Sequence, residues 1–187
     1  MYQAPTDAFV VFEHIPFNMF TSDQLNNNHY VVLLPQEWLY GFSIFLKNDV
    51  NYHLNFLVEN SAIDTLNYIE FWSDLIELTS TPRLLVYYII YFYTLKSRFS
   101  LFIYNNDGMF VNSVEKIFKN ALWLERESGE MYGINYKNKS DSRSLLLDYS
   151  RNENPMLKDF PTEGWEDIFY DFFEHKLTYS KHFFVEL

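Results

Sequence analysis

The pattern of apolar and polar positions predicts a domain that mixes strands and helices. The apolar, β-branched run 30–34 ends at Pro35 and indicates a first strand. Residues 36–47 carry apolar side chains at roughly helical spacing and predict an amphipathic helix. A second strand is expected at 54–58, and apolar spacing within 65–81 favours a short helical insertion.

The most apolar part of the chain predicts a long β-hairpin. Residues 83–95 and 99–104 are rich in aromatic and β-branched side chains, and the polar residues 96–98 join them. The Asn and Gly residues of 105–108 predict a turn after the hairpin. A membrane-spanning helix needs roughly twenty apolar residues. Because this apolar run is shorter, we expect a buried element and no direct membrane span.

The clearest helical period covers residues 113–128. Asn112 and Glu115 fit a capping box at its start. Glu125 falls within the apolar arc of this helix, whereas Trp123 falls on the polar side. The apolar arc is formed by Val114, Ile117, Phe118, Ala121, Leu122 and Leu124.

The position of Glu125 predicts a specific partner for its carboxylate. A carboxylate on a buried face costs several kcal/mol unless it is paired or hydrogen-bonded. We therefore expect a cationic or backbone partner, with Arg143 and Lys158 as the candidate cations. The alternative is a helix that ends early and leaves Glu125 in solvent. Trp123, on the opposite side, is expected to contact a second surface.

The chain is expected to contain one folded domain between two extensions. Residues 1–28 are interpreted as an N-terminal extension, 29–142 as an α+β core and 143–187 as an extended tail that contacts a partner. The predicted fold class is a single α+β domain with a small mixed sheet flanked by helices. The tail loses regular periodicity after Tyr149, and 168–184 is expected to form a terminal hairpin.

Composition excludes several classes of protein. The 187 residues include 25 acidic and 14 basic side chains, which give a net charge of −11. This acidic balance argues against electrostatic binding to nucleic acid. The sequence contains no cysteine, so disulfides, thiolate zinc sites and cysteine-ligated iron–sulfur clusters are excluded for these residues. Aromatic residues make up 20% of the chain, which is consistent with a partner surface, with AT-rich coding, or with both.

No motif for catalysis, cofactor binding or metal binding is found. The five glycines form neither a dinucleotide nor a phosphate-binding loop, and the five histidines lack the spacing of metal ligands. Glu125 and Glu127 lie about 200° apart around a helix, so they cannot flank one substrate atom. We therefore expect no catalytic, cofactor-binding or metal-binding residue in this chain.

The segment 123–134, with the sequence WLERESGEMYGI, is the most specific part of the chain. It resembles the signature of the 30-kilodalton subunit of respiratory complex I, the proton-pumping NADH:ubiquinone oxidoreductase. The resemblance is strong over 123–161 and weaker from about residue 30 to the end. Departures include Gly129 in place of an aromatic residue and Ser144 where an arginine is common. The signature and expected partner-interface residues are Trp123, Glu125, Arg126, Glu127, Glu130, Gly133, Arg143, Asp148, Lys158, Asp159 and Pro161.

The resemblance implies a core subunit of the peripheral arm without a cofactor of its own. In this family the subunit lies against the 49-kilodalton subunit and neighbouring peripheral-arm subunits, near the quinone-reducing module. FMN and iron–sulfur clusters would then belong to other subunits. The AT-type bias and the absence of an Arg-rich transit peptide in 1–17 suggest a chain encoded in the mitochondrion. Its expected location is the matrix side of the inner membrane.

The hypothesis from sequence is that the chain carries no electrons itself and holds other parts of an electron-transfer complex in position. Arg143, Lys158 and Asp159 are expected to make charge-assisted hydrogen bonds to the partner subunit. One alternative is a stand-alone acidic binding or inhibitor protein. A second alternative is the equivalent subunit of a plastid-type or hydrogenase-type relative.

Overall fold

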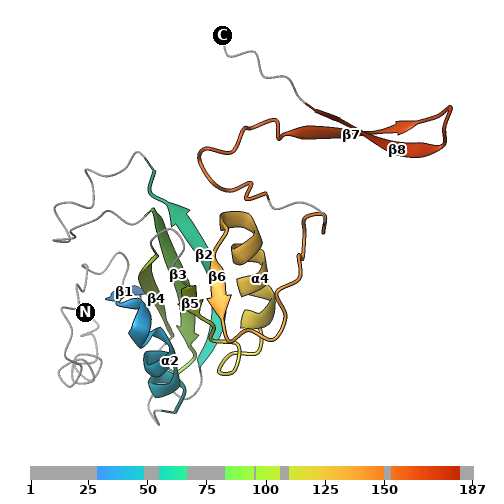
Figure 1. Cartoon of the computed structure of the whole chain (residues 1–187). Coiled ribbons are helices and arrows are strands. Elements are labelled where there is room, and N and C mark those ends of the chain that lie inside the picture. Colours follow the sequence, from blue (N-terminus) through green and yellow to red (C-terminus); the bar gives the residue numbers. More distant parts are fainter. Residues whose placement is uncertain are drawn as a thin grey trace.

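The computed structural model has an α+β fold, which confirms the predicted fold class (Figure 1). The predicted N-terminal extension, nearly all of the 65–81 insertion and the turn at 106–108 lie outside the described residues. The division of the chain at residue 142 stays a prediction. The structure describes residues 29–48, 55–66, 83–94, 96–105, 110–149 and 153–181.

A mixed four-stranded sheet forms the centre of the molecule, with the strand order β1-β4-β3-β2. β1 (His29–Leu34) runs parallel to β4 (Ser97–Asn105), so the predicted first strand is confirmed. β3 (Leu84–Phe92) is antiparallel to β4 and to β2 (Asn55–Asp64). β3 is an inner strand whose even-numbered side chains are buried and whose odd-numbered ones are mostly half-buried, which accounts for its nearly continuous apolar sequence.

The predicted long hairpin and the predicted 36–47 helix are both confirmed. Phe92 of β3 pairs with Ser97 of β4 across a short connection. The 3-10 helix η2 (Gln36–Trp38) leads into α2 (Leu39–Asn48). The Asn55 side-chain amide donates a 2.6 Å hydrogen bond to the carbonyl of Leu46, which ties the last turn of α2 to the start of β2.

One hydrophobic core joins the sheet to the elements that cover it. In β3 the inward side chains are the even-numbered ones, from Leu84 to Phe92. Phe92 and Phe99 make an edge-to-face contact with their ring centroids 4.6 Å apart. The helix α2 and the chain around Phe118 complete this core. In the described part of the chain, no helix is long and apolar enough to cross a membrane.

The helix predicted at 113–128 begins later than its apolar pattern suggested. α4 spans Ala121–Tyr132 and ends at Gly133, which has a left-handed φ of 73°. Residues 113–120 form turns instead, and the proposed Asn112–Glu115 capping box is wrong. The Glu115 carboxylate accepts hydrogen bonds from Ser140 at 2.9 and 2.5 Å, so its partner lies far along the chain and not at the helix start.

Two small strand pairs complete the fold. β5 (Phe110–Asn112) pairs in parallel with β6 (Asn135–Lys137) beside α4. β7 (Glu166–Asp171) and β8 (Lys176–Lys181) form an antiparallel hairpin, which confirms the predicted terminal hairpin. This hairpin extends away from the sheet and α4 as an arm (Figure 1).

Candidate partner-binding surface

Glu125 lies at the centre of the signature segment and is fully buried, with 0% exposure. Its carboxylate accepts hydrogen bonds from the Ser113 hydroxyl at 2.6 Å and the Val114 backbone amide at 2.8 Å. The Tyr88 hydroxyl is a further donor at 3.5 Å. The predicted burial of Glu125 and its backbone partner are therefore confirmed.

The proposed cationic partners of Glu125 are wrong. Arg143 binds the Asp141 carboxylate at 2.7 Å, and the Lys158 ammonium donates to the Leu66 carbonyl at 2.9 Å. Both cations lie at the surface, whereas the carboxylate is enclosed by neutral donors. Burial raises the pKa of Glu125 above its ordinary value, against the opposing effect of the Ser113 and Val114 hydrogen bonds.

A second buried polar cluster ties α4 to the sheet. The Ser128 hydroxyl donates a short hydrogen bond to the Asn60 side chain of β2. The Tyr136 hydroxyl lies 2.8 Å from Ser128 Oγ and donates to Asn60 at 3.0 Å. Sequence reasoning missed this cluster, because β2 also carries Asn55, Glu59, Ser61 and Asp64 and Asn60 gives no distinct signal among them.

Arg126 holds the segment that follows β6. Its guanidinium donates to the carbonyl groups of Arg143 at 2.8 Å and Ser144 at 2.9 Å. It also lies over the Trp123 ring, with 5.3 Å between the guanidinium carbon and the ring centroid. Trp123 is 57% exposed, which places it on the surface and away from the core, as its position on the helix predicted.

Glu130 fixes the next part of the same segment. Its carboxylate accepts three backbone amides, those of Leu145, Leu146 and Leu147, at 2.8–3.0 Å. Burial alone would raise the pKa of Glu130, but these hydrogen bonds outweigh burial and lower it. The acid at this signature position therefore clamps the chain's own tail.

The left-handed turn at Gly133 brings a later part of the tail close. A Cβ atom at residue 133 would stand 2.8 Å from the Asn154 side-chain nitrogen. Nearby, the amide of Met156 donates to the carbonyl of Met131 at 3.1 Å. The signature glycine is thus needed for its positive φ, and an added Cβ would also have to displace the end of the Asn154 side chain.

Asp64 and Arg83 anchor the end of this tail to the sheet. Arg83 Nη2 lies 2.6 Å from the Asp159 carboxylate and 3.4 Å from that of Asp64. The backbone amide of Lys158 donates to Asp64 at 2.9 Å. Burial opposes ionisation of Asp64, but the amides of Lys158 and Leu66 and the Arg83 guanidinium lower its pKa overall.

The remaining signature residues are less constrained. Glu127 and Asp148 are exposed, and the carbonyl of Pro161 accepts the amide of Gly164 at 3.0 Å. Arg143, Lys158 and Asp159, which the sequence assigned to a partner, make their contacts within this chain. In the described residues, no group of three or more His, Asp or Glu side chains is placed to hold a metal ion.

The β7–β8 arm has one face that is apolar except for the charged pair Glu166 and Lys181 at its base, and one mostly polar face. Cross-strand register pairs Ile168 with Tyr179 and Tyr170 with Leu177, so these four side chains share a face. They are 46–62% exposed. The other face carries Asp167, Phe169, Asp171, Lys176, Thr178 and Ser180.

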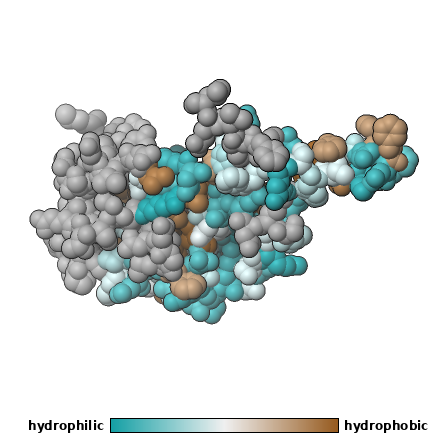
Figure 2. Space-filling model, turned by 45° about the horizontal axis from the view of Figure 1, so that its top comes forward, coloured by the Kyte–Doolittle hydropathy of each residue, from teal (hydrophilic) through white to brown (hydrophobic). Residues whose placement is uncertain are grey.

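Apolar and polar residues lie side by side on this arm, on the right of Figure 2. A two-stranded hairpin is at best marginally stable alone in water, and an exposed apolar face usually marks a contact surface. The arm is therefore the strongest candidate for a contact surface in the described chain.

Comparison with known proteins gives consistent matches along the chain. The family model described as "Respiratory-chain NADH dehydrogenase, 30 Kd subunit" matches residues 32–166. NADH-ubiquinone oxidoreductase subunit 9 of Paramecium primaurelia is 34% identical over 183 residues, covering 98% of this chain and 87% of that protein. An NADH-quinone oxidoreductase subunit of Wolbachia sp. subsp. Brugia malayi is 47% identical over 68 residues, covering 36% of each chain.

A solved structure shares the fold. The match is a chain of the membrane-bound sulfane sulfur reductase, an archaeal respiratory membrane complex, with a TM-score of 0.63 and 15% sequence identity. It covers 83% of this chain and 84% of the other. At this low identity the likeness concerns the fold alone.

Proposed function

The chain belongs to the 30-kilodalton subunit family of respiratory-chain NADH dehydrogenase, complex I, and from this we propose that it is a non-catalytic scaffold of the peripheral arm. In this role it holds the quinone-reducing module in place during electron transfer from NADH to ubiquinone coupled to proton translocation. FMN and iron–sulfur clusters are carried by other subunits. The chain is located on the matrix side of the mitochondrial inner membrane.

The observation that carries this proposal is the amphipathic β7–β8 arm. Its apolar face, formed by Ile168, Tyr170, Leu177 and Tyr179, is exposed, although burying these side chains would stabilise the hairpin. We propose that this face lies against the 49-kilodalton subunit. Arg143 and Lys158, which were expected to pair with the partner, make their polar contacts within the chain. We therefore assign the partner contact to the apolar side chains of the arm.

Two positions of β8 that lie on opposite faces of the arm provide the test. Leu177→Asp places a charge on the apolar face, whereas Ser180→Asp places the same charge on the polar face. Both variants are expressed as the full chain, and the NADH dehydrogenase complex that forms with each is analysed by native electrophoresis and mass spectrometry. We expect the Leu177→Asp chain to be absent from the complex and the NADH:quinone activity to be lost. The Ser180→Asp chain should remain in the complex, with its activity retained.

The same experiment separates the competing functions. Normal assembly and activity of Leu177→Asp would contradict docking through the arm. A chain that co-purifies with no NADH dehydrogenase subunit would overturn the scaffold role and favour a stand-alone acidic binder.

A further inference from the structure

A groove of about 340 Å³ lies between the second half of α4 and the segments that follow it. Its walls come from α4, from β6 and the chain after it, and from the tail near Asn154. The charged residues that line the groove are Glu125, Arg126, Glu130, Lys139, Arg143 and Glu153.

Several of these charged groups are already engaged within the chain. The Glu130 carboxylate binds three backbone amides, and the Arg126 guanidinium binds two carbonyls. Glu125 is held by Ser113 and Val114.

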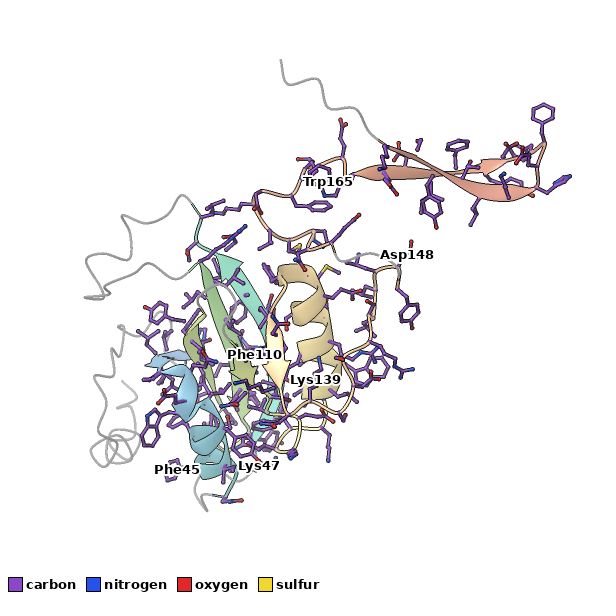
Figure 3. All side chains as sticks on the ribbon, viewed as in Figure 1. Phe45, Lys47, Phe110, Lys139, Asp148 and Trp165 are labelled. Carbon is purple, nitrogen blue, oxygen red and sulfur yellow. The ribbon has the colours of Figure 1, made fainter. Side chains whose placement is uncertain are left out.

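Lys139 is the exception among the groove's cations. Its ammonium lies 5.3 Å from the centroid of the Tyr136 ring, and it has no hydrogen-bond acceptor among the residues that the structure describes. Burial lowers its pKa to about 8, although Glu125, Glu115 and Asp141 favour its charged form. Figure 3 shows Lys139 beside α4 and β6, and Lys139 lines the groove.

Exposed apolar side chains adjoin the groove. Trp123 stacks on Arg126, which lines the groove. Leu146 is bound through its amide to Glu130 and is 62% exposed. A small soluble anion would gain little from these side chains, whereas a protein surface would bury them around a charged centre.

We propose that the groove receives a carboxylate side chain, Asp or Glu, from a partner subunit, with Lys139 as its cation. This proposal rests on the scaffold function above and adds the chemistry of a second contact, separate from the arm. The carboxylate would supply the acceptor that the Lys139 ammonium lacks, and neutral donors on the groove wall, such as Ser142 and Asn135, are available for its second oxygen.

Carbodiimide coupling of the intact complex tests this contact directly. The reagent activates a carboxyl group, the Lys139 amine attacks the carbonyl carbon, and an amide forms as the reagent leaves as a urea and the amine loses a proton. Peptide mass spectrometry then identifies both ends of the link. We expect an amide between Lys139 and an Asp or Glu of another subunit, and none at this position in Lys139→Arg.

Acylation of lysines by N-hydroxysuccinimidyl acetate gives a second measurement. Lys139 should react at least about tenfold more slowly in the complex than in the full chain alone, because a paired and buried ammonium is withheld from the reagent. Lys116, which is exposed, is the internal control for solvent access. An equal rate in both states, or a link only to Glu125 or another residue of this chain, overturns the proposal.

Two variants separate this contact from folding and from the scaffold role. Lys139→Gln should leave the unfolding midpoint of the isolated chain unchanged or higher, since it removes a desolvated charge, yet release the chain from the complex faster. Lys116→Gln should change neither. Failure of wild-type chain to co-purify with other subunits would sink the scaffold role, whereas normal retention of Lys139→Gln would sink the groove contact alone.

Discussion

Glu125 connects α4 to the turn that precedes it. Its carboxylate binds Ser113 and Val114, so one side chain closes the loop between β5 and the helix. Removing a buried acceptor leaves its donors without partners, and this penalty exceeds the value of the hydrogen bonds themselves.

Substitutions at Glu125 should therefore differ by how many donors they leave unpaired. Glu125→Ala creates a cavity and orphans the Ser113 hydroxyl and Val114 amide, so we expect about 3 kcal/mol lower unfolding free energy. Glu125→Gln keeps one carbonyl acceptor and should lose about 1 kcal/mol. Urea unfolding of the full chain measures both. Glu127→Ala, at an exposed position of the same helix, is the control and should change little.

Gly133 is the second position at which one residue decides local structure. Gly133→Ala forces a side chain into φ 73° and against the end of the Asn154 side chain, so we expect a loss of about 1–2 kcal/mol. Gly41→Ala, inside α2 with open space around the new Cβ, should instead be neutral or gain up to about 1 kcal/mol. Equal effects at the two sites in thermal unfolding would refute this account of Gly133.

At the scale of elements, the chain after β6 is held to the body at separate points. Glu130 binds the amides of 145–147, the Met131 carbonyl binds Met156, and Asp64 binds Lys158. The described residues between β6 and β7 have no helix or strand structure, so these side-chain and backbone bonds replace the ladder that a regular element would provide.

The Glu130 clamp should make stability depend on pH in a defined direction. Because its folded pKa lies below the ordinary 4.5, the unfolded chain binds more protons as pH falls below that value. The contribution of Glu130 is thus complete above pH 4.5 and is lost as pH falls through the lowered pKa. Glu130→Gln should be less stable at pH 7, on the order of 1 kcal/mol, and should show a flatter acid dependence.

Hydrogen exchange gives a local readout of the same variant. The amides of Leu145, Leu146 and Leu147 should exchange faster in Glu130→Gln than in the native chain. In Glu127→Gln they should keep their native rates. Unchanged protection in Glu130→Gln would show that another contact holds the segment.

At the scale of the whole molecule, the body and the β7–β8 arm are distinct. The core cluster takes its residues from the sheet, α2, α4 and the segments between them, and none from the arm. A chain that stops at Gly164 should therefore keep cooperative unfolding, with a midpoint within a few degrees of the full chain and a slightly smaller denaturant slope. Loss of cooperativity in that truncation would mean that the arm contributes to the core.

The local elements of the fold were predictable because their signals are short in range. The run at 30–34, the helix at 36–47 and both hairpins follow from apolar periodicity and the polar residues between them. The start of α4 was not predictable in this way, because Val114 and Phe118 are buried and Ile117 is partly buried at helical spacing, although residues 113–120 form only turns. The periodicity of apolar residues shows which side chains are buried. A turn packed against a sheet can bury residues at the same spacing as a helix.

For the candidate site, too, some features could be predicted from the sequence and others could not. The sequence by itself determined the family, the burial of Glu125 and the outward position of Trp123, since identity of residues and helical phase are enough for each. Only the tertiary structure decided what the charges bind: Glu130 and Arg126 hold the chain's own tail, and Asp159 pairs with Arg83. These partners are far apart in sequence, and their choice depends on how the tail returns to the sheet, which no local pattern encodes.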